Sequence, residues 1–154
     1  MDFKIIIETF RKEGKLTIRD GKGHVFQIQK FQNCPPGEED ILLIHEMFQL
    51  KGIVGDFSEV ALDIVEFSPD KLIFHSPKMG RLFDAPKSNE FIKFALIKHP
   101  YWNKLLFRLG EVVFFRPMIS SSWQVETQEV FPLLEGKIKE IQLNAQGGVK
   151  ILKG

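Results

Sequence analysis

Apolar residues near the N-terminus recur with the spacing of an amphipathic helix. The positions that define this spacing are Phe3, Ile6, Ile7 and Phe10. Residues three and four apart lie on one face of an α-helix, and Asp2 can cap the first turn. Gly14 is typical of the residue that follows a helix C-terminus. The pattern predicts a helix over residues 3–13.

The next two segments are rich in residues that favour strands. Residues 15–19 and 25–31 flank the sequence Asp20-Gly21-Lys22-Gly23. An Asp-Gly pair supplies the positive φ angles of a tight hairpin turn. We therefore predict a β-hairpin over residues 15–31.

Residues 32–76 predict a loop followed by strands. Pro35-Pro36-Gly37 interrupts regular structure, so residues 32–40 are expected to form a surface loop. Residues 41–48 fit either a short buried helix or a strand with a bend, and we favour the strand. Residues 59–67 alternate, with Val60, Leu62 and Ile64 on one face, and residues 71–76 follow after a turn. Together they predict an antiparallel meander.

The second half of the chain predicts two helices and then more strands. Residues 88–98 form the first expected helix, which Pro100 separates from a second over residues 101–109, ended by Gly110. Strands are expected at 111–115 and 123–130. A closing hairpin is expected from residues 137–143 and 149–152.

These elements favour an α+β fold in a single domain spanning residues 1–154. Its centre would be a largely antiparallel meander or barrel-like sheet, with an N-terminal helix and a helical insertion near residues 88–109. A doubly wound parallel sheet would need helices between successive strands, and few connections here are long enough.

Composition excludes several classes of protein. The 154 residues are 44% hydrophobic and 27% charged, which is typical of a globular domain and not of a disordered chain. Apolar runs reach only four residues, as at 41–44, so no transmembrane segment is expected. The N-terminus is unlike a signal peptide and Cys34 is the single cysteine, so we expect a cytoplasmic protein.

Motifs for catalysis or metal binding are absent from the sequence. It contains neither a phosphate-binding glycine loop nor a serine between glycines at the spacing of a nucleophile. Four histidines are scattered without metal-ligand spacing, and Cys34 lies in an acidic loop that disfavours a thiolate. We therefore predict no metal, cofactor or catalytic residue. One alternative is an enzyme whose pocket in the sheet uses histidines such as His45 and His75.

Charge is distributed unevenly although the total is only +1. Residues 1–30 carry a net +3, residues 31–77 a net −7, residues 78–110 a net +5, and the remainder is neutral. An acidic segment is therefore followed by a basic one, which marks a candidate functional surface.

The basic insertion supplies the predicted ligand-binding residues. They are Lys78, Arg81, Lys93, Lys98, Lys104 and Arg108. We expect a small non-catalytic binding or regulatory domain that engages an anionic ligand, such as a nucleotide, or an acidic protein surface. Double-stranded DNA is not expected, because the isoelectric point of 7.8 lacks the basicity of such proteins. A self-assembling homo-oligomeric structural subunit is the remaining alternative.

Overall fold

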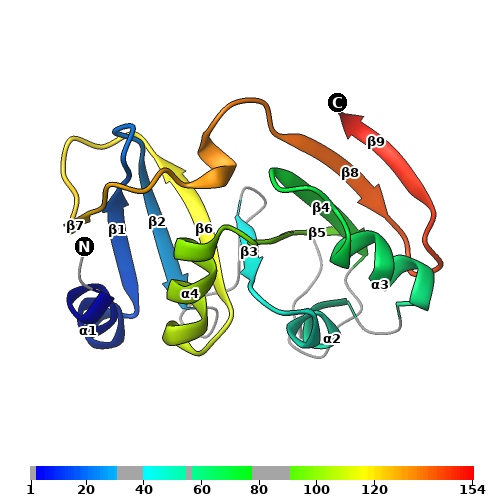
Figure 1. Cartoon of the computed structure of the whole chain (residues 1–154), viewed down its shortest axis with the longest axis horizontal. Coiled ribbons are helices and arrows are strands. Elements are labelled where there is room, and N and C mark those ends of the chain that lie inside the picture. The colour runs from blue at the N-terminus through cyan, green and yellow to red at the C-terminus, as the bar shows by residue number, and fades with distance from the viewer. Residues whose placement is uncertain (1–2, 31–39, 55–56, 78–90) are drawn as a thin grey trace.

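The computed structural model describes residues 3–30, 40–54, 57–77 and 91–154. Within these residues the chain has an α+β fold in which four α-helices accompany a nine-stranded sheet (Figure 1). The helices are α1 (Phe3–Glu13), α2 (Leu50–Val54), α3 (Glu59–Glu66) and α4 (Pro100–Leu109), and two 3-10 turns are η2 (Met47–Gln49) and η3 (Pro132–Leu134). None of the described helices is long and apolar enough to span a bilayer.

The sheet is mixed. Its strands are β1 (Lys15–Arg19), β2 (Val25–Lys30), β3 (Ile41–Ile44), β4 (Leu72–Pro77), β5 (Phe91–Leu96), β6 (Val113–Met118), β7 (Val125–Glu126), β8 (Lys139–Leu143) and β9 (Val149–Lys153). They lie in the order β7-β1-β2-β6-β3-β5-β4-β8-β9. Five neighbouring pairs are antiparallel, whereas β1–β7, β3–β5 and β4–β8 are parallel. The largely antiparallel α+β prediction is thus right in outline, but the strands do not follow one another as a meander.

Local sequence chemistry accounts for the N-terminal elements. The predicted helix is α1, and Gly14 follows it with a φ of +75°. The predicted hairpin is β1–β2, although its positive φ lies at Gly23 and not in the Asp-Gly pair. Gly21 is required for another reason, since a Cβ there would lie 2.0 Å from the carbonyl oxygen of Gln128.

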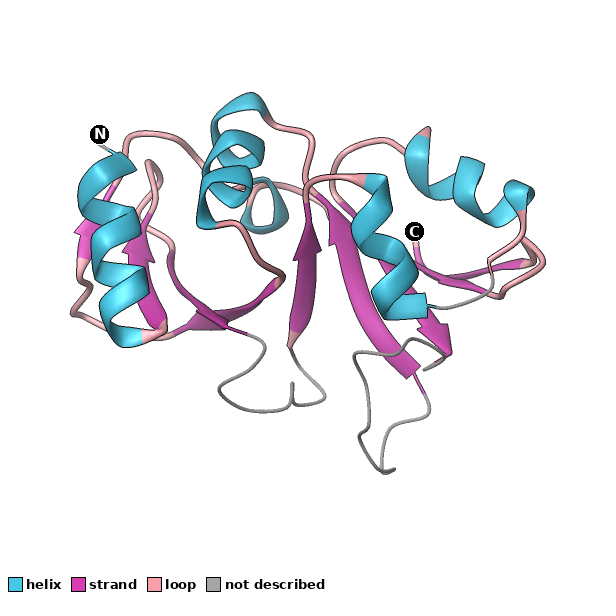
Figure 2. Cartoon of the chain, turned by 90° about the horizontal axis from the view of Figure 1, so that it is seen from below, coloured by secondary structure: helices cyan, strands magenta, loops and turns pink. Residues whose placement is uncertain are grey.

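Two hydrophobic cores lie on opposite faces of the sheet and meet at β3. Ile41 and Leu43 belong to the core beneath α1 and α4, whereas Leu42 and Ile44 belong to the core beneath α2 and α3. Alternate residues of a strand point to opposite faces, so β3 is buried on both sides. Figure 2 shows α1 and α4 along one half of the sheet and α2 and α3 along the other.

The predicted strand at residues 59–67 is wrong, because this segment is α3. Ser58 caps the helix by accepting a hydrogen bond from the Ala61 amide at 3.2 Å. Ala61 and Val65, four residues apart, are its buried positions, whereas Val60 is exposed. The segment carries both an alternating and a helical apolar pattern, and the cap together with the core beneath Val65 selects the helix.

The helix predicted over residues 88–98 is also wrong. Residues 91–96 form β5, which pairs with β3 on one side and β4 on the other, while residues 88–90 lie outside the described residues. Ile92 and Phe94 are buried in the α2–α3 core, and Ala95 in the other. Pairing with two strands that are distant in the sequence therefore selects a strand here, in spite of the local helical pattern.

The helical insertion consists of α4 within the described residues. His99 caps α4, Pro100 is in its first turn and Gly110 ends it with a φ of +77°, as the sequence predicts for residues 101–109.

Two predicted strands are shorter in the structure. The strand predicted at 123–130 is reduced to β7, and the strand predicted from residue 41 ends after β3, where η2 and α2 follow. The closing hairpin is β8–β9. Most of the predicted loop at residues 32–40 lies outside the described residues.

Candidate functional site

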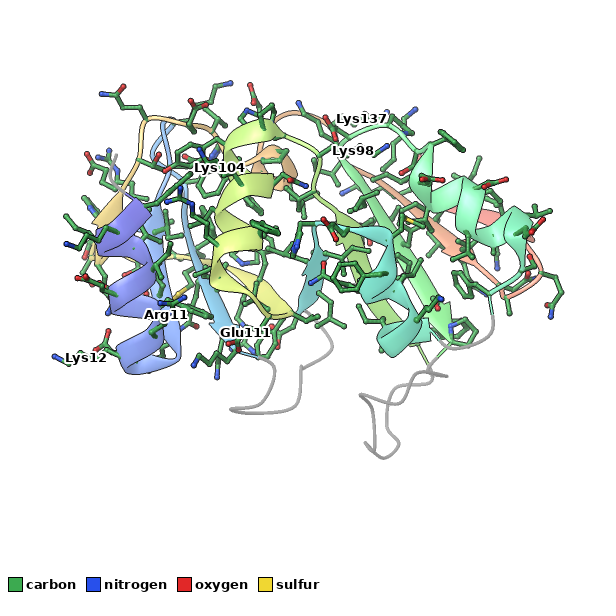
Figure 3. All side chains as sticks on the ribbon, turned by 60° about the horizontal axis from the view of Figure 1, so that its bottom comes forward. Arg11, Lys12, Lys98, Lys104, Glu111 and Lys137 are labelled. Carbon is green, nitrogen blue, oxygen red and sulfur yellow. The ribbon has the colours of Figure 1, made fainter. Side chains whose placement is uncertain are left out.

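The predicted basic residues that the structure describes come from different elements. Lys78 and Arg81 lie outside the described residues, while Lys93 is on β5 and Lys104 and Arg108 are on α4. Figure 3 shows Lys104 on α4 and Lys98 on the segment between β5 and α4. The described part of this basic segment, residues 91–110, thus carries its cations on β5, on α4 and on the connection between them.

Lys98 has a structural contact. Its Nζ donates a hydrogen bond to the carbonyl oxygen of Glu66 at 2.8 Å and another to that of Ser68. These carbonyls lie at the C-terminal end of α3, where a cation interacts favourably with the helix dipole. Lys98 thus ties the segment after β5 to the end of α3.

Lys104 and Arg108 flank an aromatic ring of α1. Lys104 Nζ lies 5.9 Å and Arg108 Cζ 5.4 Å from the centroid of Phe3. Both cations are exposed, and these distances fit cation–π contacts. The two cations therefore lie close together over one ring, where α4 meets α1.

Lys93 belongs to a row of polar residues that crosses four strands on one face of the sheet. Lys93 is directly opposite His75 of β4. His75 is in register with Gln142 of β8, and Gln142 is opposite Lys150 of β9. Residues in register on neighbouring strands share a face. We call Lys93, His75, Gln142 and Lys150 the sheet row.

A carboxylate orients the imidazole in this row. His75 Nε2 lies 2.7 Å from Glu140 Oε1, and both side chains are partly buried. Such a contact holds the ring and leaves Nδ1 without a described protein partner, so this nitrogen can form a hydrogen bond with a group placed beside it.

The lysines of the sheet row have no ion-pair partner within the described part of the chain, and the nearby carboxylate of Glu140 is engaged with His75. Neither Lys93 nor Lys150 makes a described ion pair, and Lys93 is only partly exposed. A partly buried ammonium without a carboxylate is better stabilised when an anion lies beside it. The geometry of the sheet row therefore suits an oxyanion.

The histidines do not gather into one pocket. His45 lies at the end of β3 against Phe107, and His75 pairs with Glu140. His24 contacts Asp20 at 3.0 Å. His99 caps α4. In the described ranges no three His, Cys, Asp or Glu side chains are grouped as a metal site.

Sequence reasoning missed that Glu140 contacts His75 and that Gln142 and Lys150 share a row with Lys93. Glu140 is 65 residues from His75 along the chain, and β4 and β8 are paired in parallel. Pairing between distant strands depends on the register, which no local motif in either strand specifies.

Comparison with known proteins shows similarity of fold. No family model and no curated protein matches the sequence. Among solved structures, E. coli YciO has a TM-score of 0.70 at 13% identity, over 98% of this chain and 87% of YciO. P. abyssi Sua5 in complex with L-threonine has a TM-score of 0.66 at 14% identity, over 97% of this chain and 53% of Sua5.

A third similar structure is full-length HypF in its phosphate- and nucleotide-bound form, with a TM-score of 0.62 at 10% identity over 97% of this chain and 28% of HypF. The chain thus spans about half the length of P. abyssi Sua5. At such low identities these likenesses show a shared fold.

Proposed function

We propose that this chain is a binding domain for a small ligand that carries phosphate-type oxyanions, and that the sheet row binds them. The observation that carries the proposal is Lys93, a partly buried ammonium without a described ion-pair partner, next to the oriented imidazole of His75. Hydrogen bonds between a cation and an oxyanion are stronger than those between neutral groups.

The length of the sheet row indicates the size of the ligand. Lys93 and Lys150 are separated by three strand spacings, or roughly 14 Å between backbones. Flexible lysine side chains can reach toward each other over this distance, with His75 and Gln142 between them. A di- or triphosphate fits this span better than a single phosphate ion. The phosphate and nucleotide bound by HypF, which shares the fold, support this ligand class.

Replacing Lys93 with glutamine is expected to weaken the binding of ATP about tenfold or more. A charge-assisted hydrogen bond contributes about 1.5–3 kcal/mol, and 1.4 kcal/mol corresponds to a factor of ten in Kd. Isothermal titration calorimetry of the full chain with ATP measures the effect. Lys12→Gln on α1 is the matched control, since it removes the same charge from an exposed helix position. Absent ATP binding, or equal losses in the two variants, would refute the proposal.

The surface around Lys104 and Arg108 is a second candidate for anion binding, because both cations are exposed over Phe3. The double variant Lys104→Glu with Arg108→Glu distinguishes the two surfaces. If ATP binds at the sheet row, its affinity changes less than threefold in this variant. Loss of a salt-sensitive interaction in the folded double variant would instead assign binding to α4, as the charge map of the sequence predicts.

The predicted regulatory role and cytoplasmic location belong to the same proposal. Binding without catalysis predicts that ATP remains intact after prolonged incubation with the protein. If the chain were instead an enzyme, it would turn over ATP. Because Glu140 orients His75, this turnover would then be lost in His75→Ala and retained in His45→Ala.

A further inference from the structure

A separate cleft lies where α2 and α4 approach each other beyond the end of β3. Its volume is about 450 Å³, within the range of small-molecule sites. The walls come from η2 and α2 on one side, and from the C-terminal turn of α4 and the residues between α4 and β6 on the other. None of its lining residues belongs to the sheet row.

Two exposed aromatic side chains line this cleft. Phe48 of η2 is 66% exposed and Phe107 of α4 is 60% exposed. Phe107 also packs edge-on against the imidazole of His45, with ring centroids 5.7 Å apart. Two exposed aromatic rings in one cleft offer apolar contact area, and aromatic faces attract cations.

The backbone of His45 is held from both sides. Its N–H donates to Gln49 Oε1 at 2.8 Å, and its carbonyl oxygen accepts from Asn103 Nδ2 at 3.0 Å. The side-chain Nδ1 is buried and has no hydrogen-bond partner among the described residues. Burial lowers the pKa of His45, although the charge of Glu46 opposes this in part. Burial thus favours the uncharged form of the ring, which adds little positive charge to the cleft.

The charge that lines the cleft is negative. Among the described residues, Glu111 is its one ionisable lining residue besides His45, and no described lysine or arginine lines it. The carboxylate of Glu111 is partly exposed, and its contact with Lys30 is long at 3.9 Å. Gly110 ends α4 here, and a helix C-terminus carries partial negative charge. A Cβ at Gly110 would meet no atom within 4 Å, so the wall is open at this point.

We propose that this cleft binds a small alkylated ammonium cation, with Phe48 and Phe107 against its alkyl groups and the carboxylate of Glu111 near its charge. Aromatic side walls, a carboxylate and the lack of a lining cation are the features with which proteins recognise quaternary ammonium groups. This chemistry is opposite to that of the sheet row, so the two proposals can be tested independently.

The test uses choline and its uncharged isostere 3,3-dimethylbutan-1-ol as probes. Both are titrated into the full chain labelled with ¹⁵N, and amide chemical shifts are followed by NMR. Choline is expected to shift the amides of Gly52 and Gly110 and to bind at least tenfold more tightly than the alcohol. Equal affinities would show an apolar pocket without cation recognition and would overturn the proposal, as would shifts confined to other residues or no binding at millimolar choline.

Two variants assign the roles of the lining side chains. Phe107→Leu keeps an apolar surface but removes the ring, and Glu111→Gln removes the charge. Each is expected to weaken choline binding about fivefold or more. Phe67→Leu is an equally conservative change at a phenylalanine that is 76% exposed at the C-terminal end of α3 and does not line the cleft, so it is expected to leave binding unchanged. Unaltered affinity in both cleft variants would contradict the proposal even if choline binds.

Discussion

Replacing Trp102 with alanine is expected to lower the free energy of unfolding by about 3–5 kcal/mol, because this side chain is central to the core beneath α4. Trp102 is 2% exposed. Its ring meets Phe26 and Phe131 edge-on, with centroids 5.8 and 5.1 Å away, and its indole N–H donates to the carbonyl oxygen of Val130 at 2.9 Å. Alanine removes the packing and leaves that carbonyl without its partner.

Thermal and urea unfolding measure this effect. A loss of this size lowers Tm by roughly 10 °C in a domain of this length. Trp123→Ala is the matched control, since Trp123 is 38% exposed and stacks beneath Arg19 at 4.7 Å. Its loss is expected to stay near 1 kcal/mol. If both tryptophans had equal effects, the assignment of Trp102 to the core would be wrong.

Replacing Asp20 with alanine is expected to cost about 2–4 kcal/mol of stability through lost hydrogen bonds. The carboxylate is fully buried and accepts from the amides of Lys22, His24 and Phe131 at 2.9–3.0 Å. It also contacts the imidazole of His24. Asp20 therefore joins the β1–β2 turn to the segment that follows β7, and its removal leaves these amides unpaired.

The pH dependence of stability gives an independent measure of Asp20. Burial by itself would raise the pKa of this carboxyl, but the hydrogen bonds from Phe131, His24 and Lys22 outweigh burial and hold the pKa below its usual 3.8. The folded chain thus binds this proton less readily than the unfolded chain. The stabilisation is complete above about pH 4 and declines as the pH falls toward the folded pKa.

Asp20→Asn is therefore expected to be destabilising at pH 6 and less so below pH 4, as followed by urea unfolding at several pH values. Asp70→Asn replaces an exposed carboxylate and serves as the control. A stability difference between the wild-type chain and Asp20→Asn that did not shrink on acidification would show that Asp20 contributes through shape and not through its charge.

The sequence predicts some residues of the candidate site individually, but it does not predict which of them lie next to each other. Lys93 is a predicted ligand-binding residue, and His75 belongs to the predicted alternative with an enzymatic pocket. The two residues are adjacent because β4 pairs with β5. This pairing could not be predicted, since a helix was expected over residues 88–98. Likewise, the contact of His75 with Glu140 depends on a parallel pair between strands far apart in the chain.

The sequence by itself determined the elements whose signals are local. The helix α1 and the β1–β2 hairpin have apolar spacing, capping residues and turn glycines within a few residues of one another, so neighbours in the chain suffice to select them. The same holds for α4, where Pro100 and Gly110 mark the ends.

Tertiary structure decided the remaining elements and the candidate sites. Residues 59–66 and 91–96 have short apolar patterns that are compatible with both the helical and the strand period. Burial against segments distant in the chain selected the helix α3 and the strand β5. The sheet row and the α2–α4 cleft each combine side chains from several elements. Their positions follow from strand order, register and helix packing, and the free energy that selects these features comes from burial between segments remote in sequence.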